Sequence, residues 1–250
     1  MSDFNIYRED CLQTMARLPD NSVNHCVTSP PYNFNLRIHN GKYTRRSVNE
    51  KTKYDGDFED AMPMQEYFEW QKRVISEMLR VSSGLIFYNI QMVTGNKVAV
   101  MKLLGHFAEQ VKEVIVWDKI NSEPAMGERV LNSEFEFIII FDKSNAISRQ
   151  FCSANFDRGT LSNIFRIKKN GENDAHEIHK AAFPRSLPYL LIKHFTCEGE
   201  TIYDPFMGTG TTGLVCIELK RGFVGSEINQ RYFDLSKKRF NYKACSPELF

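Results

Sequence analysis

Residues 27–35 read VTSPPYNFN and place a hydroxyl, two adjacent prolines and an aromatic ring directly after an apolar-rich stretch. Proline fixes its own φ and has no backbone N–H, so Pro30 and Pro31 predict a rigid corner without a donor. Ser29 precedes this corner and Tyr32 follows it. By itself such a run is most often a turn or a proline-rich ligand. At the end of a strand it holds a small hydroxyl and an aromatic face in fixed positions.

A second stretch, TIYDPFMGTGTTG at residues 201–213, predicts a strand, a glycine-rich turn and the start of a helix. Gly208 and Gly210 can take backbone angles that other residues avoid, which lets a ligand lie against the main chain. Thr211 or Thr212 is expected to cap the helix. The alternative interpretation is a purely structural one, a tight strand-to-helix turn that binds no ligand.

Glu227 ends the next predicted strand, GFVGSE, fifteen residues after Thr212. A carboxylate at such a strand tip accepts hydrogen bonds from both hydroxyls of a ribose. The turn has neither the G-x-G-x-x-G of nicotinamide enzymes nor the lysine of a phosphate loop. Asp204, just before the turn, would repel a pyrophosphate but suits a ligand with an ammonium group. These features indicate S-adenosylmethionine as the cofactor, with no metal.

Together the two stretches resemble one family, the DNA amino-methyltransferases that modify an exocyclic nitrogen of cytosine or adenine. TSPPY is similar to the catalytic motif of that family, and DPFMGTGTT is similar to its cofactor motif. The resemblance extends over REDCLQTMARLPDNSVNHCVTSPPYN, KYDGDF and HKAAFPRSLPYLLIKHF. Residues from about 144 to 175 do not resemble the family and are specific to this protein. Because the catalytic motif comes first, the order resembles the circularly permuted beta group.

The resemblance implies two sets of site residues. The catalytic set is Ser29, Pro30, Pro31 and Tyr32, and the cofactor set is Asp10, Cys11, Phe183, Asp204, Phe206, Gly208, Gly210, Thr211, Thr212 and Glu227. Two positions depart from the family, which commonly has Gly-Asp in place of Glu9-Asp10 and His-Pro-Ala in place of His179-Lys180-Ala181. Asp10 is equally well explained as a helix cap, and Phe183 and Phe206 as plain core residues.

The chemistry explains the residue types. A nucleobase amino group is a weak nucleophile because its lone pair is delocalised into the ring. If the Ser29 hydroxyl and the Pro30 carbonyl accept the two amino hydrogens, the lone pair is aimed at the methyl sulfonium. The base must leave the duplex stack, and stacking on Tyr32 offsets about 1–3 kcal/mol of that cost. Serine at the first motif position favours cytosine N4, with adenine N6 as the rival.

Two other classes of function stay open at this point. An RNA or protein-amide methyltransferase has similar catalytic elements, and a nucleoside-binding module without catalysis would share the glycine turn. The permuted order and a basic insertion argue against the first, and the intact SPPY argues against the second. The six scattered cysteines are bystanders, because direct transfer from sulfur to nitrogen needs no covalent intermediate.

Short apolar runs alternate with helical-period segments, which is the pattern of parallel strands joined by crossover helices. Strands are expected at 4–7, 23–28, 85–90, 111–119, 135–143, 201–206 and 222–227, and helices at 11–18, 66–82, 183–195, 211–220 and 232–242. The expected fold is therefore α/β, and the resemblance implies that residues 1–250 form a single methyltransferase domain. The resemblance makes it Rossmann-like and circularly permuted, with a mostly parallel sheet, helices on both faces and an inserted target-recognition region.

Two polar stretches interrupt this pattern. Residues 36–58 are interpreted as a mobile loop near the DNA, and residues 144–180 as the target-recognition region. The net charge of +1 excludes a whole-chain polybasic binder, so phosphate contacts must come from a local patch. Its expected members are Arg37, Arg45, Arg46, Lys168 and Lys169.

The expected partner is double-stranded DNA, with a cognate restriction endonuclease and a second copy of the chain as further candidates implied by the family. The N-terminus, MSDFNIYRED, has no apolar core of a signal peptide, and no apolar run reaches the length of a membrane span. The expected location is the cytoplasm.

Overall fold

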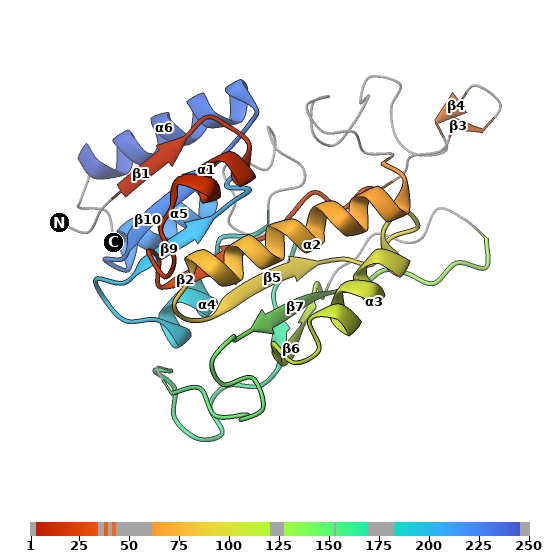
Figure 1. The fold of residues 1–250 in the computed structure, drawn as a ribbon, viewed down its shortest axis with the longest axis horizontal. Helices are drawn as coiled ribbons and strands as arrows, with labels where there is room; N and C mark the ends of the chain where they lie inside the picture. The colour runs from red at the N-terminus through yellow and green to blue at the C-terminus, as the bar shows by residue number, and fades with distance from the viewer. Residues whose placement is uncertain are drawn as a thin grey trace.

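The computed structural model describes residues 4–34, 38–39, 42–43, 62–120, 128–152, 154–169 and 183–245. These residues form an eight-stranded sheet in the order β1-β10-β9-β2-β5-β7-β6-β8, together with a small separate hairpin (Figure 1). The strands of the main sheet are β1 (Phe4–Tyr7), β2 (His25–Thr28), β5 (Ile86–Ile90), β6 (Val111–Asp118), β7 (Phe135–Phe141), β8 (Ile164–Arg166), β9 (Thr201–Asp204) and β10 (Gly222–Ser226). The hairpin pairs β3 (Ile38–His39) with β4 (Lys42–Tyr43).

Seven of the eight strands in the main sheet run in one direction. The eighth, β7, is antiparallel to both of its neighbours, β5 and β6. Strands β6 and β7 follow each other without an intervening helix among the described residues, which suits an antiparallel pair. The mostly parallel sheet expected from the sequence is therefore confirmed.

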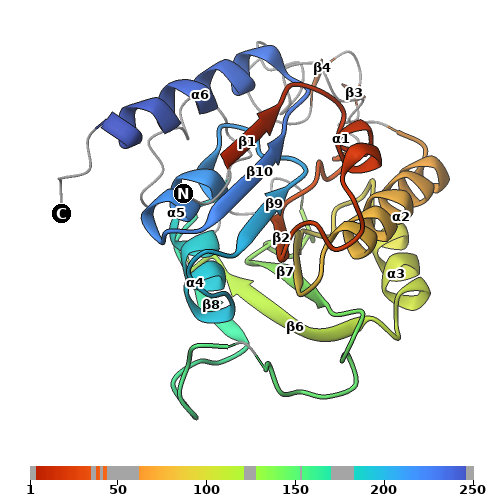
Figure 2. The same ribbon diagram turned by 60° about the vertical axis from the view of Figure 1, so that its left-hand side comes forward.

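The described helices cover both faces of this sheet (Figure 2). One face packs under α1 (Cys11–Arg17), α2 (Met64–Val81) and α3 (Lys97–His106), and the other under α4 (Ser186–Phe195), α5 (Thr211–Glu218) and α6 (Gln230–Cys245). Alternate residues of strand β5 point to opposite faces of the sheet, so both faces carry an apolar layer that the helices cover. Phe87 points into the layer under α4–α6, whereas Ile86 and Tyr88 point into the layer under α1–α3.

The sequence did not predict helix α3, strand β8 or the paired strands β3 and β4, which lie within residues 36–58, interpreted above as a loop. Ala99, Val100 and Leu103 of α3 face the core, whereas Val98 and Met101 are exposed. Helix α3 therefore carries apolar residues on its exposed side as well as on its buried side, and this hides the helical period of its sequence. Gly105 also lies within this helix. Strand β8 is only three residues long and pairs with the end of β6.

The order of the strands creates a switch point between β9 and β2. From β2 the chain crosses through α2 to β5 on one side, and from β9 it crosses through α5 to β10 on the other. In open α/β sheets, ligands bind in the crevice outside the carboxyl ends of the strands at such a point. The Ser29 corner follows β2 and the glycine turn follows β9, so both lie at this edge.

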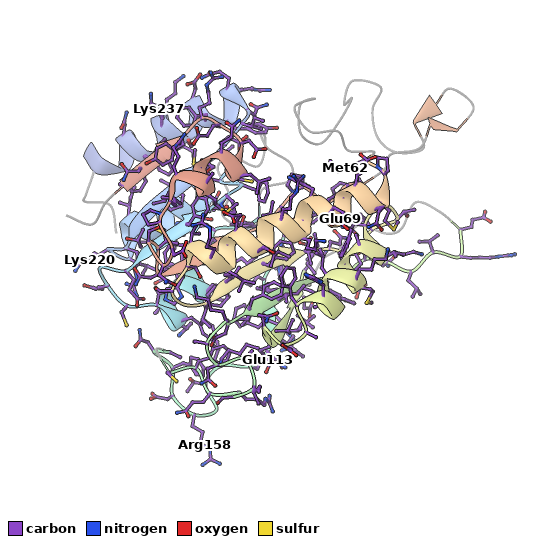
Figure 3. All side chains as sticks on the ribbon, viewed as in Figure 1. Met62, Glu69, Glu113, Arg158, Lys220 and Lys237 are labelled. Carbon is purple, nitrogen blue, oxygen red and sulfur yellow. The ribbon has the colours of Figure 1, made fainter. Side chains whose placement is uncertain are left out.

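The described part of residues 144–163 lies at the opposite edge. Strand β7 ends where β5 and β6 begin, and the Asp142 N–H donates to the Gln110 carbonyl just before β6. Further along, the Asn155 N–H donates to the carbonyl of His194 at the end of α4. Figure 3 shows Arg158 on the far side of the molecule from Met62, which lies beside the corner. Only from β8 onward does the chain return to the carboxyl edge.

Five of the cysteines, Cys11, Cys26, Cys152, Cys197 and Cys216, carry free thiols. In the described ranges, no three His, Cys, Asp or Glu side chains gather closely enough to hold a metal ion. Of the helices described, none combines the length and the apolar character that crossing a membrane requires.

Candidate active site

Hydrogen bonds with two other segments, residues 62–67 and Gly95, hold the corner after β2. The Tyr67 hydroxyl of α2 donates to the Pro31 carbonyl over 2.7 Å. Asn33 is fully buried and adopts a φ of +56°, a conformation that asparagine tolerates better than most residues. Its amide nitrogen donates to the carbonyls of Met62 and Gly95, and its oxygen accepts from the Met62 N–H, each over 2.9 Å. The corner is therefore a rigid platform.

A buried polar cluster lies beneath the corner. The Ser29 hydroxyl is 2.8 Å from the Tyr32 hydroxyl, which donates to Glu136 of β7 over 2.7 Å. Asn89 of β5 donates to the Tyr32 hydroxyl over 2.7 Å and to Glu136 over 2.9 Å. Lys119, just after β6, forms an ion pair with Glu136 at 3.4 Å. Ser29 is half-buried, and the other four side chains of this Ser29 cluster are buried.

The glycine turn holds the carboxylate of Glu227 with backbone donors. The Gly208 N–H donates to one carboxylate oxygen over 2.9 Å, and the Asn229 N–H donates to the other over 2.8 Å. Both carboxylate oxygens are therefore anchored to the backbone of the turn and of the residue two positions after Glu227. Gly208 has a φ of +53° and Gly210 a φ of +85°, so the predicted need for glycine is confirmed at both positions.

The helix after the turn starts differently from the expectation. Gly210 is the N-cap of α5, and no side chain caps the helix, so the prediction that Thr211 or Thr212 is the cap is wrong. The Thr212 hydroxyl donates instead to Asp204 over 2.7 Å. The Thr211 hydroxyl is buried and finds no hydrogen-bond partner among the residues that the structure describes. An unpartnered buried hydroxyl beside a ligand loop fits a polar ligand group that satisfies it.

Asp204 joins the two halves of the site. Its carboxylate accepts from the Thr28 hydroxyl over 2.8 Å, from Thr212 at the start of α5, and from the Phe206 N–H over 3.1 Å. It is 1% exposed, and burial raises its pKa to about 6, despite these hydrogen bonds, which lower it. Because Thr28 adjoins Ser29, this one carboxylate fixes the corner against the glycine turn.

Asp10 and Cys11 lie beside Glu227, because β1 pairs with β10 and the Glu227 N–H donates to the Tyr7 carbonyl. Asp10 is the N-cap of α1, where its side chain accepts from the Leu12 N–H over 2.8 Å. Burial, followed by the charges of Asp10 and Glu227, raises the pKa of the Cys11 thiol well above its usual range. A buried thiol with a raised pKa is a poor nucleophile, in keeping with a reaction that needs no covalent intermediate.

The two phenylalanines of the expected cofactor set lie on opposite faces of the sheet. Phe206 packs in the layer under α1–α3, with its ring 5.7 Å from that of Trp70. Phe183 packs in the layer under α4–α6, three residues before α4 begins. Both are half-buried, so each keeps an accessible surface. Trp117 is a core residue, and its ring N–H donates to the Ile167 carbonyl.

Lys168 and Lys169 follow β8 at the carboxyl edge. Lys168 is exposed and Lys169 is half-buried. Burial, and to a smaller extent the charge of Lys169, lowers the pKa of Lys119, whereas Glu136 raises it. Lys169 is therefore near the Ser29 cluster. Arg37, Arg45 and Arg46 lie outside the described residues.

The fold and this site define an α/β protein in which a glycine turn and the Glu227 carboxylate lie at the same sheet edge as a polar corner, and comparisons with known proteins place it in a family. Residues 23–238 match the DNA methylase family of N6- and N4-specific enzymes, so the chain belongs to that family. The Type II methyltransferase M2.MboI of Moraxella bovis is 28% identical over 250 residues, which cover 96% of this chain and 88% of the relative.

Two solved structures share the fold. The PvuII DNA methyltransferase, described as cytosine-N4-specific, superposes with a TM-score of 0.73 at 18% identity, over 96% of this chain and 87% of that one. M1.HpyAVI, solved as a complex with SAM, superposes with a TM-score of 0.62 at 22% identity, over 94% and 99%. The expected family and fold are thus confirmed.

Sequence reasoning missed the residues that support the corner: Asn33, Tyr67, Asn89, Lys119 and Glu136. A signal existed for two of them, because Asn89 and Glu136 each interrupt an apolar strand, LIFYNI and FEFIIIF. A polar residue buried in such a strand must find a hydrogen-bond partner. The partner itself is visible only once the strand order is known.

Proposed function

We propose that this DNA methylase moves the methyl group of S-adenosylmethionine to the exocyclic amino group of a base flipped out of duplex DNA. The proposal rests above all on the hydrogen bond between Thr28 and Asp204, at 2.8 Å. That bond joins the strand end that carries Ser29 to the strand end that carries the glycine turn. A methyl donor in the turn is then adjacent to an amine at the corner.

The cofactor residues fit the parts of S-adenosylmethionine. Two backbone N–H groups fix the Glu227 carboxylate beside the turn, where we assign it to the ribose hydroxyls, and the Thr211 hydroxyl offers a buried partner. The buried charge of Asp204 favours a cationic ligand above it. M1.HpyAVI, which shares the fold, was solved with SAM and supports the same choice. When bound, the cofactor supplies an electrophilic methyl group.

The corner supplies acceptors for the amine. In this proposal, the Ser29 hydroxyl and the Pro30 carbonyl accept the two amino hydrogens, which localises the nitrogen lone pair for attack on the methyl carbon. The Tyr67 bond to Pro31 and the three bonds of Asn33 keep these acceptors from moving. Tyr32 is 8% exposed with its hydroxyl fixed, so its ring presents an immobile edge or face to the base.

We assign cytosine N4 as the favoured target and adenine N6 as the alternative. Ser29 begins the SPPY motif, and serine there is typical of cytosine enzymes in the family that the chain resembles. The cytosine-N4-specific PvuII enzyme, with the same fold, agrees with this choice. The order of the two motifs along the chain supports membership of the beta group.

DNA contact is assigned to residues 36–58 and to the segment after β8, including Lys168 and Lys169. These lysines follow a strand that ends at the carboxyl edge, near the Ser29 cluster. Within the proposed target-recognition region of 144–180, this geometry favours the part after β8 over residues 144–163. Relatives named Type II methyltransferases support a role beside a restriction endonuclease in the cytoplasm.

The test is nucleoside analysis of unmethylated plasmid DNA after incubation with the purified protein and S-adenosylmethionine. We expect N4-methylcytosine, detected by mass spectrometry against synthetic standards. N6-methyladenine would establish the alternative target. If duplex DNA gains no methylated amine while RNA of matched sequence does, the DNA assignment is wrong.

A further inference from the structure

The Ser29 cluster raises a question that the proposed function leaves open. A hydroxyl can donate or accept a hydrogen bond, and only an accepting Ser29 oxygen can hold an amino hydrogen of the base. The distance of 2.8 Å between the Ser29 and Tyr32 hydroxyls does not say which of them donates. The buried residues that bind the Tyr32 hydroxyl determine which of the two donates.

Glu136 determines the direction of the whole chain of hydrogen bonds. Its carboxylate accepts only, and three donors surround it: the Lys119 ammonium at 3.4 Å, the Asn89 amide at 2.9 Å and the Tyr32 hydroxyl at 2.7 Å. The single proton of Tyr32 therefore points to Glu136. The Tyr32 oxygen is left as an acceptor, and the amide of Asn89 donates to it over 2.7 Å.

The Ser29 hydroxyl must then donate its own proton inward to Tyr32. Asn89 has two amide hydrogens and three acceptors within reach, and its contact with Ser29, at 3.3 Å, is the longest. The lone pairs of Ser29 are thus left for a group outside the cluster. Ser29 is the half-buried member of the five, so this group comes from the crevice.

We propose that Glu136, held by Lys119, is a positioning residue that makes the Ser29 hydroxyl an acceptor for the target amine. This inference rests on the proposed function and deepens it. Glu136 acts through Tyr32 and does not touch the substrate itself. Asp204 and Glu227 lie on the cofactor side and take no part in this cluster.

The Glu136→Gln variant should reverse the direction of the hydrogen bonds that run from Ser29 through Tyr32 to residue 136. Glutamine has one oxygen and one NH2 group, and Lys119 can only donate, so the oxygen must face Lys119. The NH2 group then faces Tyr32, which turns to accept from it and donates its proton to Ser29. A Ser29 hydroxyl that already accepts from Tyr32 presents its own proton to the amine, and the two donors repel.

The primary test measures the rate of methyl transfer to unmethylated plasmid DNA at saturating cofactor and DNA, together with the Kd for S-adenosylmethionine. We expect Glu136→Gln to lower kcat by about 10- to 100-fold and to leave the cofactor Kd within about twofold. Adding Lys119→Met frees the glutamine to turn its oxygen toward Tyr32. The double variant should therefore recover most of the lost rate.

The matched control is Asp142→Asn, which neutralises the other buried pair of the same two strands. Lys112 and Asp142 lie 3.2 Å apart at the opposite end of β6 and β7, with side chains 1% and 10% exposed. The Lys119–Glu136 pair is similarly buried, at 3% and 7%. Asp142→Asn should lower thermal stability and leave kcat unchanged.

A second comparison covers the case in which Glu136→Gln fails to fold. Lys119→Met combined with Glu136→Gln, and Lys119→Met combined with Glu136→Met, both remove the buried charges, but only the glutamine can take the Tyr32 proton. We expect the glutamine pair to be faster by about tenfold or more. Equal rates in this comparison, or a Glu136→Gln variant as fast as the wild type, would overturn the inference. A wild-type protein that methylates no DNA would overturn the proposed function instead.

Discussion

Replacing Asp204 by asparagine should remove a pH-dependent loss of stability that the site imposes on the fold. Burial raises the pKa of Asp204 from 3.8 to about 6. In the range between these values the folded chain binds more protons than the unfolded chain, so the free energy of unfolding falls as the pH rises. The stabilising contribution is fully present below pH 3.8 and is lost as the pH rises through about 6.

The magnitude follows from the two pKa values. At about 1.4 kcal/mol per pH unit, the interval from 3.8 to about 6 amounts to about 3 kcal/mol. About 2 kcal/mol of this loss falls between about pH 4.5 and pH 7. Asparagine keeps the oxygen that accepts from Thr28 and the Phe206 N–H, and Thr212 can turn its hydroxyl to accept from the new amide.

The assay is urea unfolding of the wild type and Asp204→Asn at both pH values. Other acidic groups titrate alike in the two proteins and cancel in the difference. We expect the free energy of unfolding of the variant, relative to that of the wild type, to rise by about 2 kcal/mol between pH 4.5 and pH 7. A difference that stays constant within about 0.5 kcal/mol would refute the burial of an ionisable carboxyl at this position.

Asp142→Asn serves as the control for this titration. Burial raises the pKa of Asp142, but hydrogen bonds from Ser144, Asn145 and Lys112 outweigh it and hold the pKa below 3.8. A lowered pKa stabilises the fold above the unfolded value, and that stability is lost as the pH falls through the folded pKa. This window lies below pH 4.5, so the difference between wild type and control should be constant in the range tested.

Three further substitutions test the corner and the turn. Glu227→Ala should raise the Kd for S-adenosylmethionine by about 100-fold, measured by calorimetry, because the ribose acceptors are lost; a Kd within threefold of the wild type would contradict this. Gly210→Ala should cost about 2–4 kcal/mol in urea unfolding, because φ is +85° and the new Cβ overlaps the Phe240 ring. Asn33→Ala should cost about 2–4 kcal/mol in the same assay, since one buried and two partly buried backbone groups lose their partner. A loss below about 1 kcal/mol in either would show that the chain relaxes there.

Local periodicity predicted most of the elements because each buries one stripe or one face. In α2, Val74, Ile75, Met78 and Val81 recur at helical spacing and are buried. The same rule fails for α3, whose exposed Val98 and Met101 blur the period. The direction of β7 and the order of the strands depend on contacts between distant segments, which periodicity does not encode.

The candidate site divides in the same way. The Ser29 corner and the Gly208 turn are local, since proline and glycine restrict the backbone at their own positions. The supports of the corner are not local. Asn89 and Glu136 reach Tyr32 because β5 lies between β2 and β7, an arrangement that only the folded sheet reveals.

The most direct test of the central claim is single-turnover methyl transfer to duplex DNA by Ser29→Ala, with the cofactor Kd measured on the same sample. Since Ser29 lies at the corner and the cofactor residues lie at the turn, we expect the Kd to be unchanged and the rate to fall by about 100-fold or more. Transfer at the wild-type rate, or a loss explained entirely by weaker cofactor binding, would contradict the assignment of Ser29 as an acceptor for the reacting amine.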